Sequence, residues 1–305
     1  MLDFKIETFL TVCRTMNFTR AAEILHITQP AVSQHIHALE AQYGVKLFNY
    51  QGRQLRLTES GHLLLQTAAT MQHDAVRLKE TIRQKSNRRQ FCFGATLTIG
   101  EYIMPKPIVK WLQDEPDVTL RMLTANTQTL LKLLDQGKLD FAIVEGNFDK
   151  QNYDSLVYSK QRYIPVCAPN YTFTKVVDKL EDLLCERLIV REPGSGTRNV
   201  LERALKAHNL TVQSFWHVTE IGSLNLIKKL VCAGMGIAFF YEPVVQNEIA
   251  QGRLCEIALE DCRIVHDFTF LWRKGSVFAS AYQMIFDRLK EDEENAREVD
   301  NFDNQ

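Results

Sequence analysis

The sequence predicts a helical N-terminal domain, a long connecting helix and a larger α/β body. Three observations support this fold class. Apolar residues over 1–58 recur at helical spacing, those over 59–85 repeat in heptads, and from residue 91 short strand-like runs alternate with helical ones. With 305 residues, 45% hydrophobic and 24% charged, the composition is that of a soluble protein of two or three domains.

The first sixty residues show the pattern of a compact helical domain. The apolar face of the first predicted helix is formed by Ile6, Phe9, Leu10 and Cys13. We expect Thr19 to cap a second, short helix, and a break at 26–27 to follow it. Thr28 then caps a third helix, which has Pro30 in its first turn and ends at Gly44.

The third helix has two distinct faces. Its apolar face carries Val32, Ile36 and Leu39, and its polar face carries Pro30, Ser33, Gln34 and His37. The polar face is small, uncharged and rich in hydrogen-bonding groups, which suits a helix lying in the major groove of DNA. The alternative is that this face is an ordinary solvent-exposed one. The succession of a short helix, a tight turn and a capped helix argues against that alternative.

A β-wing is predicted directly after this helical unit. Gly52 supplies a turn, and Leu55 and Leu57 alternate with polar neighbours. Arg53 and Arg56 are placed to reach phosphates or a minor groove, although a surface arginine can equally be only solvated.

A heptad pattern marks the next helix, which Thr58 caps and which is expected to reach about Lys85. The heptad seam consists of Gly61, Leu64, Ala68, Met71, Ala75, Leu78 and Ile82. A dimer formed along this seam would pair two DNA-binding heads on a two-fold operator. The alternative is a lone amphipathic helix packed on its own domain. Residues 86–90 are polar and are interpreted as a hinge.

Charge is distributed unevenly along the chain. Residues 1–90 hold 12 Lys and Arg against 7 Asp and Glu, whereas the rest holds 24 against 30. A basic N-terminal part on an acidic body favours an anionic partner for that part alone. The alternative is a chance fluctuation among solvated charges.

The N-terminal residues resemble those of the LysR-type transcriptional regulators. The matching runs are Phe9, Asn17-Phe18-Thr19-Arg20-Ala21-Ala22-Glu23, Thr28-Gln29-Pro30-Ala31-Val32-Ser33-Gln34-His35-Ile36, Leu39-Glu40, Gly44, Leu47-Phe48, Arg53 and Leu57-Thr58-Glu59-Ser60-Gly61. The resemblance implies a winged helix-turn-helix over 1–58, a linker helix and hinge over 59–90, and an effector-binding domain over 91–290. It also implies a dimer of dimers, contact with RNA polymerase, and DNA contacts from Arg20, Thr28, Gln29, Pro30, Ser33, Gln34, His37, Arg53 and Arg56.

The alternation of strands and helices predicts an α/β body, and the resemblance implies two lobes similar to type 2 periplasmic binding proteins. Predicted strands are 91–95, 118–123, 141–144, 164–167, 188–190, 213–217 and 236–240, and predicted helices are 100–113, 127–136, 197–208 and 222–233. The family pattern assigns 91–162 and 267–290 to lobe I and 163–266 to lobe II, with two crossing strands as the hinge. The acidic tail over 291–305 lacks apolar periodicity and is expected to fray.

Hydroxyl-rich segments follow several predicted strands, where open α/β sheets bind ligands. Together with the resemblance, they predict an effector site formed by Thr96, Thr98, Ile99, Thr124, Asn126, Glu145, Gly194, Ser195, Thr197 and Gly222. Hydroxyls and free N–H groups at helix starts suit an anion, and the 191–198 run resembles a subgroup that regulates sulfur and carbon assimilation. Glu145 opposes a bare anion unless Arg191 or Arg198 pairs with it, and it could instead favour an amine.

Two alternative functions have less support in the sequence. An α/β enzyme acting on a phosphorylated or anionic small molecule would need a nucleophile, base or metal constellation, and no such motif is found. No protein cofactor or metal is therefore expected. Thiol sensing is a further possibility among seven cysteines, of which Cys255 and Cys262 are the closest in sequence. Without a secretory signal or a long apolar run, we expect a cytoplasmic protein that does not enter a membrane.

Overall fold

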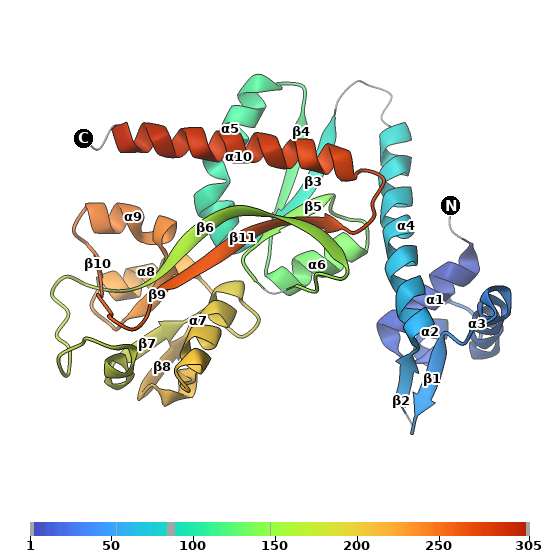
Figure 1. Cartoon of the computed structure of the whole chain (residues 1–305), viewed down its shortest axis with the longest axis horizontal. Coiled ribbons are helices and arrows are strands. Elements are labelled where there is room, and N and C mark those ends of the chain that lie inside the picture. Colours follow the sequence, from blue (N-terminus) through green and yellow to red (C-terminus); the bar gives the residue numbers. More distant parts are fainter. Residues whose placement is uncertain (1–2, 53, 84–88, 147, 303–305) are drawn as a thin grey trace.

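The computed structural model describes residues 3–52, 54–83, 89–146 and 148–302. Figure 1 shows an N-terminal helical domain, one long helix, and an α/β body beyond it. Among the described residues, no helix combines the length and the apolarity needed to cross a bilayer.

Three helices form the N-terminal domain: α1 (Phe4–Thr15), α2 (Phe18–Leu25) and α3 (Gln29–Tyr43). Phe9 and Val12 are fully buried in their shared core. The prediction that Thr19 caps α2 is wrong. Asn17 is the cap, because its side chain accepts a hydrogen bond from the Arg20 N–H at 3.0 Å, and Thr19 lies inside the helix.

Helix α3 begins and ends as the sequence predicts. The Thr28 hydroxyl accepts a hydrogen bond from the Ala31 N–H, Pro30 lies in the first turn, and Gly44 ends the helix in the left-handed conformation with φ 69°. Strands β1 (Phe48–Gln51) and β2 (Gln54–Leu57) follow as an antiparallel hairpin turning at Gly52. The wing is therefore confirmed, whereas Arg53 lies outside the described residues.

Helix α4 (Glu59–Arg83) starts at the predicted cap, where the Thr58 hydroxyl accepts from the Gly61 N–H at 3.0 Å. The predicted end near Lys85 and hinge residues 86–88 lie outside the described residues. The seam is divided in two. Gly61 and Ala68 are buried against the chain's own N-terminal domain, so the prediction that they face a partner helix is wrong for them. Met71, Leu78 and Ile82 are exposed.

Lobe I is built on parallel strands β3 (Gln90–Ala95), β4 (Thr119–Thr124) and β5 (Phe141–Val144). Helix α6 (Thr127–Asp135) connects β4 to β5, as predicted. The single helix predicted over 100–113 is instead a π-helical turn, η1 (Ile99–Ile103), followed by α5 (Pro105–Asp114). Pro105 and Pro107 lack backbone N–H donors, so the helix restarts there with a proline in its first turn.

Two long antiparallel strands connect the lobes. Strands β6 (Tyr153–Cys167) and β11 (Ile264–Arg273) pair along their length, with an irregular register between Phe268 and Thr269. Figure 1 shows these strands crossing from one lobe to the other. The predicted lobe boundaries at 162/163 and 266/267 fall within these strands, and the strand predicted over 164–167 is the end of β6.

Lobe II contains β7 (Arg187–Val190), β8 (His217–Glu220), β9 (Ala238–Tyr241) and β10 (Cys255–Glu256). Helices α7 (Gly196–Ala207), α8 (Leu224–Cys232) and α9 (Glu242–Ala250) pack around them, with 3₁₀ turns η2 (Leu180–Cys185) and η3 (Val212–Ser214). The strand predicted over 213–217 is wrong: η3 occupies its start, and β8 pairs with β7 only from His217. Here strand pairing outweighed local β-propensity.

The chain ends on α10 (Ala279–Phe302), so the prediction that the tail frays from Glu291 is wrong. Four glutamates, together with Ala296 and Arg297, favour helix in that segment even without an apolar stripe. Figure 1 shows α10 lying across lobe I beside α5.

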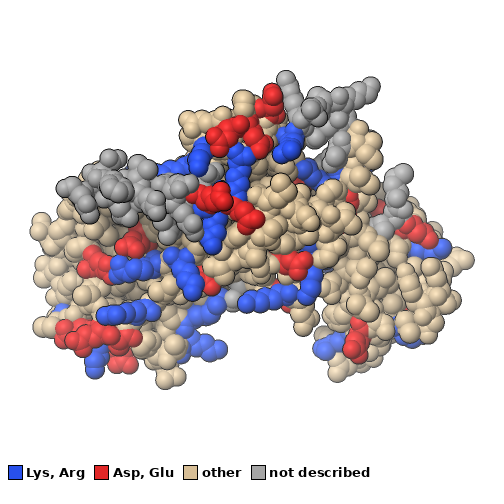
Figure 2. All heavy atoms as spheres, turned by 45° about the horizontal axis from the view of Figure 1, so that its top comes forward, with Lys and Arg blue, Asp and Glu red and all other residues tan. Residues whose placement is uncertain are grey.

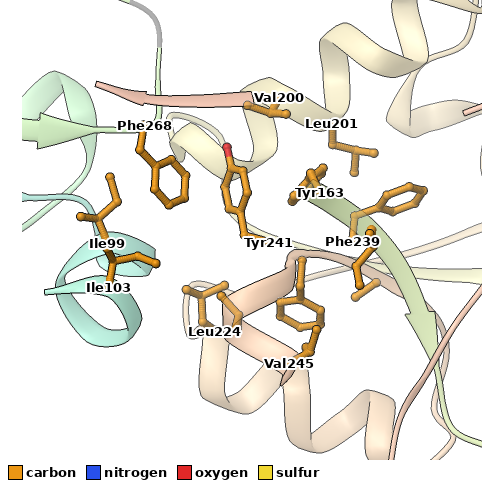
Figure 3. Close-up of a cluster of buried hydrophobic side chains, with 14 of the residues drawn as sticks. Ile99, Ile103, Tyr163, Val200, Leu201, Leu224, Phe239, Tyr241, Val245 and Phe268 are labelled. Carbon is orange, nitrogen blue, oxygen red and sulfur yellow. The ribbon is translucent and has the colours of Figure 1, made fainter. Parts of the chain in front are cut away.

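One continuous hydrophobic core runs through both lobes. It includes Phe93 and Ile99 from lobe I, and Leu188 and Val231 from lobe II. In Figure 3, Tyr241 lies between Phe268 and the η1 residues Ile99 and Ile103 on one side and Tyr163 on the other. The lobes therefore meet across packed side chains as well as along the crossing strands.

Candidate functional site

The polar face of α3 is presented to solvent. Gln29, Pro30, Gln34 and His37 are exposed, and Ser33 is half-buried. On the opposite face, Val32, Ile36 and Leu39 are 0–2% exposed. The Gln29 amide donates to the Ser33 hydroxyl at 2.9 Å, which orders one turn of the face. The helix is thus anchored by its apolar side while its hydrogen-bonding side remains accessible.

Other predicted contacts flank this face. Arg20 on α2, Thr28 at the start of α3 and Arg56 on β2 are all exposed. Figure 2 shows acidic and basic side chains interspersed over the face in view, so the basic excess of the N-terminal part is not a single large patch there.

Glu40 positions the wing, a role that the sequence alone did not indicate. Its carboxylate is 8% exposed and accepts hydrogen bonds from Lys46 Nζ at 2.6 Å and the Leu47 N–H at 2.9 Å. Burial alone would raise the pKa of Glu40, but these hydrogen bonds outweigh it and lower the pKa below its ordinary value. The ionised carboxylate therefore joins α3 to the start of β1.

Helix α4 is joined to lobe I by several polar contacts. His73 Nε2 bonds the Leu139 carbonyl at 2.9 Å, and Arg77 Nε pairs with Asp140 at 2.9 Å. Asp74 accepts from the Ser276 hydroxyl at 2.7 Å, and Arg273 donates to the Gln66 carbonyl at 3.1 Å. Because these groups are mostly buried, the orientation of α4 is coupled to lobe I in this arrangement.

The second cluster lies where the lobes touch. Thr96 and Thr98 follow β3, Glu145 follows β5, and Ser195 and Thr197 begin α7. Every one of the five is at most 2% exposed. The Thr197 hydroxyl donates to Glu145 Oε1 at 2.9 Å, which is a direct bond between the lobes. These five predicted effector residues therefore lie together, buried where the two lobes are in contact.

Hydrogen bonding in this cluster is incomplete. Within the described part of the chain, the hydroxyls of Thr96 and Thr98 and Glu145 Oε2 make no hydrogen bond of normal geometry. Both hydroxyls nevertheless lie close enough to the Glu145 carboxyl to lower its pKa. Ser195 occupies the cap position of α7 without a side-chain capping bond. Buried polar atoms are normally paired, so unpaired ones gathered at one point indicate a group that can bind there.

Glu145 determines the electrostatics of the cluster. Burial raises the pKa of its carboxyl above the ordinary value, which favours the protonated form. Arg191 bonds Glu192 at 2.7 Å, and Arg198 bonds Glu202 at 2.8 Å and Glu220 at 2.6 Å. Both arginines therefore have other carboxylate partners. Burial therefore shifts Glu145 toward its protonated form, while the neighbouring threonine hydroxyls and Arg191 act in the opposite direction on its pKa.

The remaining predicted effector residues differ in position. Ile99 is fully buried in η1, and Thr124 is half-buried against Gly100. Asn126 is exposed and caps α6 by accepting from the Thr129 N–H at 2.9 Å, so its side chain is already used locally. Gly194 adopts φ 89° at the turn into α7, and Gly222 is exposed near Glu192.

Sequence reasoning did not find Tyr163 and Tyr241, which line the interlobe contact. Both are buried, and their ring centroids lie 4.9 Å apart. They come from β6 and β9, and each lies one residue outside the strands predicted over 164–167 and 236–240. No group of three or more His, Cys, Asp or Glu able to hold a metal occurs among the described residues.

Both halves of the chain match models of one family. Residues 5–62 match the bacterial regulatory helix-turn-helix protein, lysR family, and residues 84–293 match the LysR substrate binding domain. The chain belongs to the LysR family. It is a LysR-type DNA-binding transcriptional regulator with an effector-binding domain, rather than an enzyme.

Two relatives illustrate the range of the family. CfxR of Cupriavidus necator is 33% identical to this LysR-type chain over 257 residues, covering 82% of this chain and 78% of CfxR. YeiE of Escherichia coli K12 is 28% identical over 269 residues, covering 88% and 89%.

Solved structures share the fold. Full-length LysG from Corynebacterium glutamicum, with bound effector Arg, has a TM-score of 0.63 at 18% identity and covers 97% of this chain and 99% of that one. The Synechocystis PCC6803 CcmR regulatory domain, in complex with 2-PG, has a TM-score of 0.59 at 20% identity, covering 66% and 96%.

Proposed function

We propose that this LysR-type regulator reads its operator with the exposed face of α3. Ser33 and Gln34 address base edges, with Gln29, Pro30 and His37 beside them, and Arg20, Thr28, Arg53 and Arg56 contact the backbone or a groove. The supporting observation is the two-sided character of α3, whose polar face takes almost no part in holding the domain together.

The heads are proposed to act in pairs. The exposed apolar residues Met71, Leu78 and Ile82 would pack against a second α4, with Leu64 and Ala75 at the edges of the contact. Two dimers would then form a tetramer on DNA and contact RNA polymerase. Because bacterial operators lie in the cytoplasm, the protein would work there.

The effector is proposed to be a small anion bound between the lobes. The hydroxyls of Thr96 and Thr98, which make no hydrogen bond of normal geometry, and the start of α7 at Ser195 and Thr197 offer donors to it. A protonated Glu145 would donate as well, so its carboxyl does not oppose an anion. Two structures that share the fold hold different small molecules, 2-PG in the CcmR regulatory domain and Arg in LysG.

Regulation would follow from differential affinity. An effector that binds one lobe arrangement more tightly shifts the population toward it. Lobe I holds α4 through His73, Asp74 and Arg77, so a change between the lobes can reach the DNA-binding heads.

The DNA-binding proposal is tested by titrating operator DNA with Ser33→Ala and Gln34→Ala variants. Each should weaken specific binding roughly 10-fold to 100-fold, because one good base contact is worth about 1–3 kcal/mol. Gln42→Ala, at the far end of the same helix, is the matched control. Unchanged operator affinity in both variants would remove this face from the proposal.

The effector proposal is tested in two steps. A thermal-shift screen of small anions and central metabolites first finds a compound that raises Tm. Isothermal titration with that compound should then show loss of binding in Thr98→Val and Thr197→Val, while operator binding without effector persists. Undiminished affinity in both variants would place the effector elsewhere.

A further inference from the structure

Two cysteines face each other at the edge of lobe II. Cys167 ends β6 and Cys255 begins β10, and the two residues are directly opposite in the antiparallel pairing. Their sulfur atoms lie 3.4 Å apart. Cys167 is buried and Cys255 is half-buried. Opposed positions on antiparallel strands bring the Cβ atoms close enough for a disulfide after a small rotation of the side chains.

This pair could not be found from the spacing of cysteines. Cys255 and Cys262 are closest in sequence, whereas Cys167 and Cys255 are 88 residues apart. Strand β10 follows α9, and its pairing with β6 brings Cys255 back to the end of the crossing strand. The contact therefore depends on tertiary structure.

We propose that Cys167 and Cys255 are a modification site, an oxidisable dithiol that hydrogen peroxide converts to an intramolecular disulfide. The more accessible Cys255 thiolate attacks one peroxide oxygen. An S–O bond forms, the O–O bond breaks, and hydroxide leaves to become water. The Cys167 sulfur then attacks the sulfenic sulfur, an S–S bond forms, and a second water leaves with the Cys167 proton. Two thiols are oxidised as one peroxide is reduced to two waters.

The different burial of the two thiols suits them to different steps of the oxidation. Burial raises the pKa of the Cys167 thiol, so Cys167 is a poor first nucleophile toward an oxidant in solution. It lies within contact of Cys255, however, and needs only to react with a sulfenic acid beside it. Because β10 has two residues and lies at a sheet edge, a disulfide would fasten it to the strand that connects the lobes.

The test uses the full chain treated with hydrogen peroxide, then alkylated, digested with trypsin without reduction, and analysed by mass spectrometry. Cys167 lies in the fragment 163–175, and Cys255 lies in 254–263 together with Cys262. We expect these fragments to be joined, with the loss of two hydrogen atoms, and to separate again after dithiothreitol. Cys262→Ala is the matched control that should keep the cross-link, and Cys255→Ser should abolish it.

A second measurement follows stability. Closing a long loop restricts the unfolded chain, so the oxidised protein should have a higher Tm than the reduced one, in wild type and Cys262→Ala but not in Cys255→Ser. Three results would overturn the proposal: both thiols still alkylated after peroxide, Cys255 joined to Cys262 instead, or Cys255 oxidised to an acid without the cross-link.

Discussion

The polar face of α3 and the cluster between the lobes are built in opposite ways. The α3 face comes from one continuous segment, is exposed, and has little internal bonding. The cluster draws on three segments that begin at Thr96, Glu145 and Ser195, and it is nearly inaccessible to solvent. Substitutions on the first should alter binding alone, whereas substitutions of bonded groups in the second, such as Thr197 and Glu145, should alter binding and stability together.

This difference fits the functions that we propose for the two surfaces. DNA is large and presents its edges to a protruding helix, so the reading groups can remain solvated until it arrives. A small effector must be surrounded, and the groups that surround it meet one another when the lobes close. The Thr197–Glu145 bond is an example of such a contact.

The largest effect on operator binding is expected on α4, which has buried residues near its start and exposed apolar residues further along. Changing Leu78 and Ile82 to Asp together should prevent pairing of α4 and lower operator affinity by about 10²-fold to 10⁴-fold, because two linked heads bind far more tightly than one. Sedimentation velocity and operator titration would measure both effects. Val176→Asp, at an exposed loop position, is the control. A variant that stays dimeric would show that the exposed half of the seam is not the interface.

The next prediction concerns the pH dependence contributed by Glu145. Its pKa is raised in the folded state, so from about pH 4.5 upward the unfolded chain loses the proton first. The free energy of unfolding should therefore fall as pH rises toward the raised pKa, and Glu145→Gln should remove that contribution. In thermal unfolding without effector, the Tm advantage of the variant should grow from pH 5 to pH 8. A constant difference would contradict a buried, neutral carboxyl.

The smallest effect is expected at Thr98. Its buried hydroxyl lies near the Glu145 carboxyl but makes no hydrogen bond of normal geometry among the described residues, so Thr98→Val should change the free energy of unfolding by less than about 1 kcal/mol. Thr70→Val is the contrasting variant, because the Thr70 hydroxyl bonds the Lys274 carbonyl at 3.0 Å and its loss should cost about 1 kcal/mol or more. Urea unfolding measures both. Equal destabilisation would mean that Thr98 has a structural partner.

Local rules predicted much of the fold. The limits of α3, the wing turn and strand Phe141–Val144 agree with the sequence, because caps, glycine turns and apolar runs act over a few residues. Local rules failed where the sequence allows two alternatives of similar propensity. Asn17 and Thr19 can both cap a helix, and only the completed helix shows which one accepts the bond. Strand β8 was misplaced because its partner β7 determines where pairing begins.

The sequence by itself determined the α3 face and the exposed residues that we propose read DNA, since both depend on helical periodicity within fifteen residues. Only the tertiary structure decided that Gly61 and Ala68 pack inward, that Thr197 meets Glu145, and that Cys167 meets Cys255. These contacts join residues far apart in the chain. Their formation depends on how strands pair and lobes close, which periodicity does not encode.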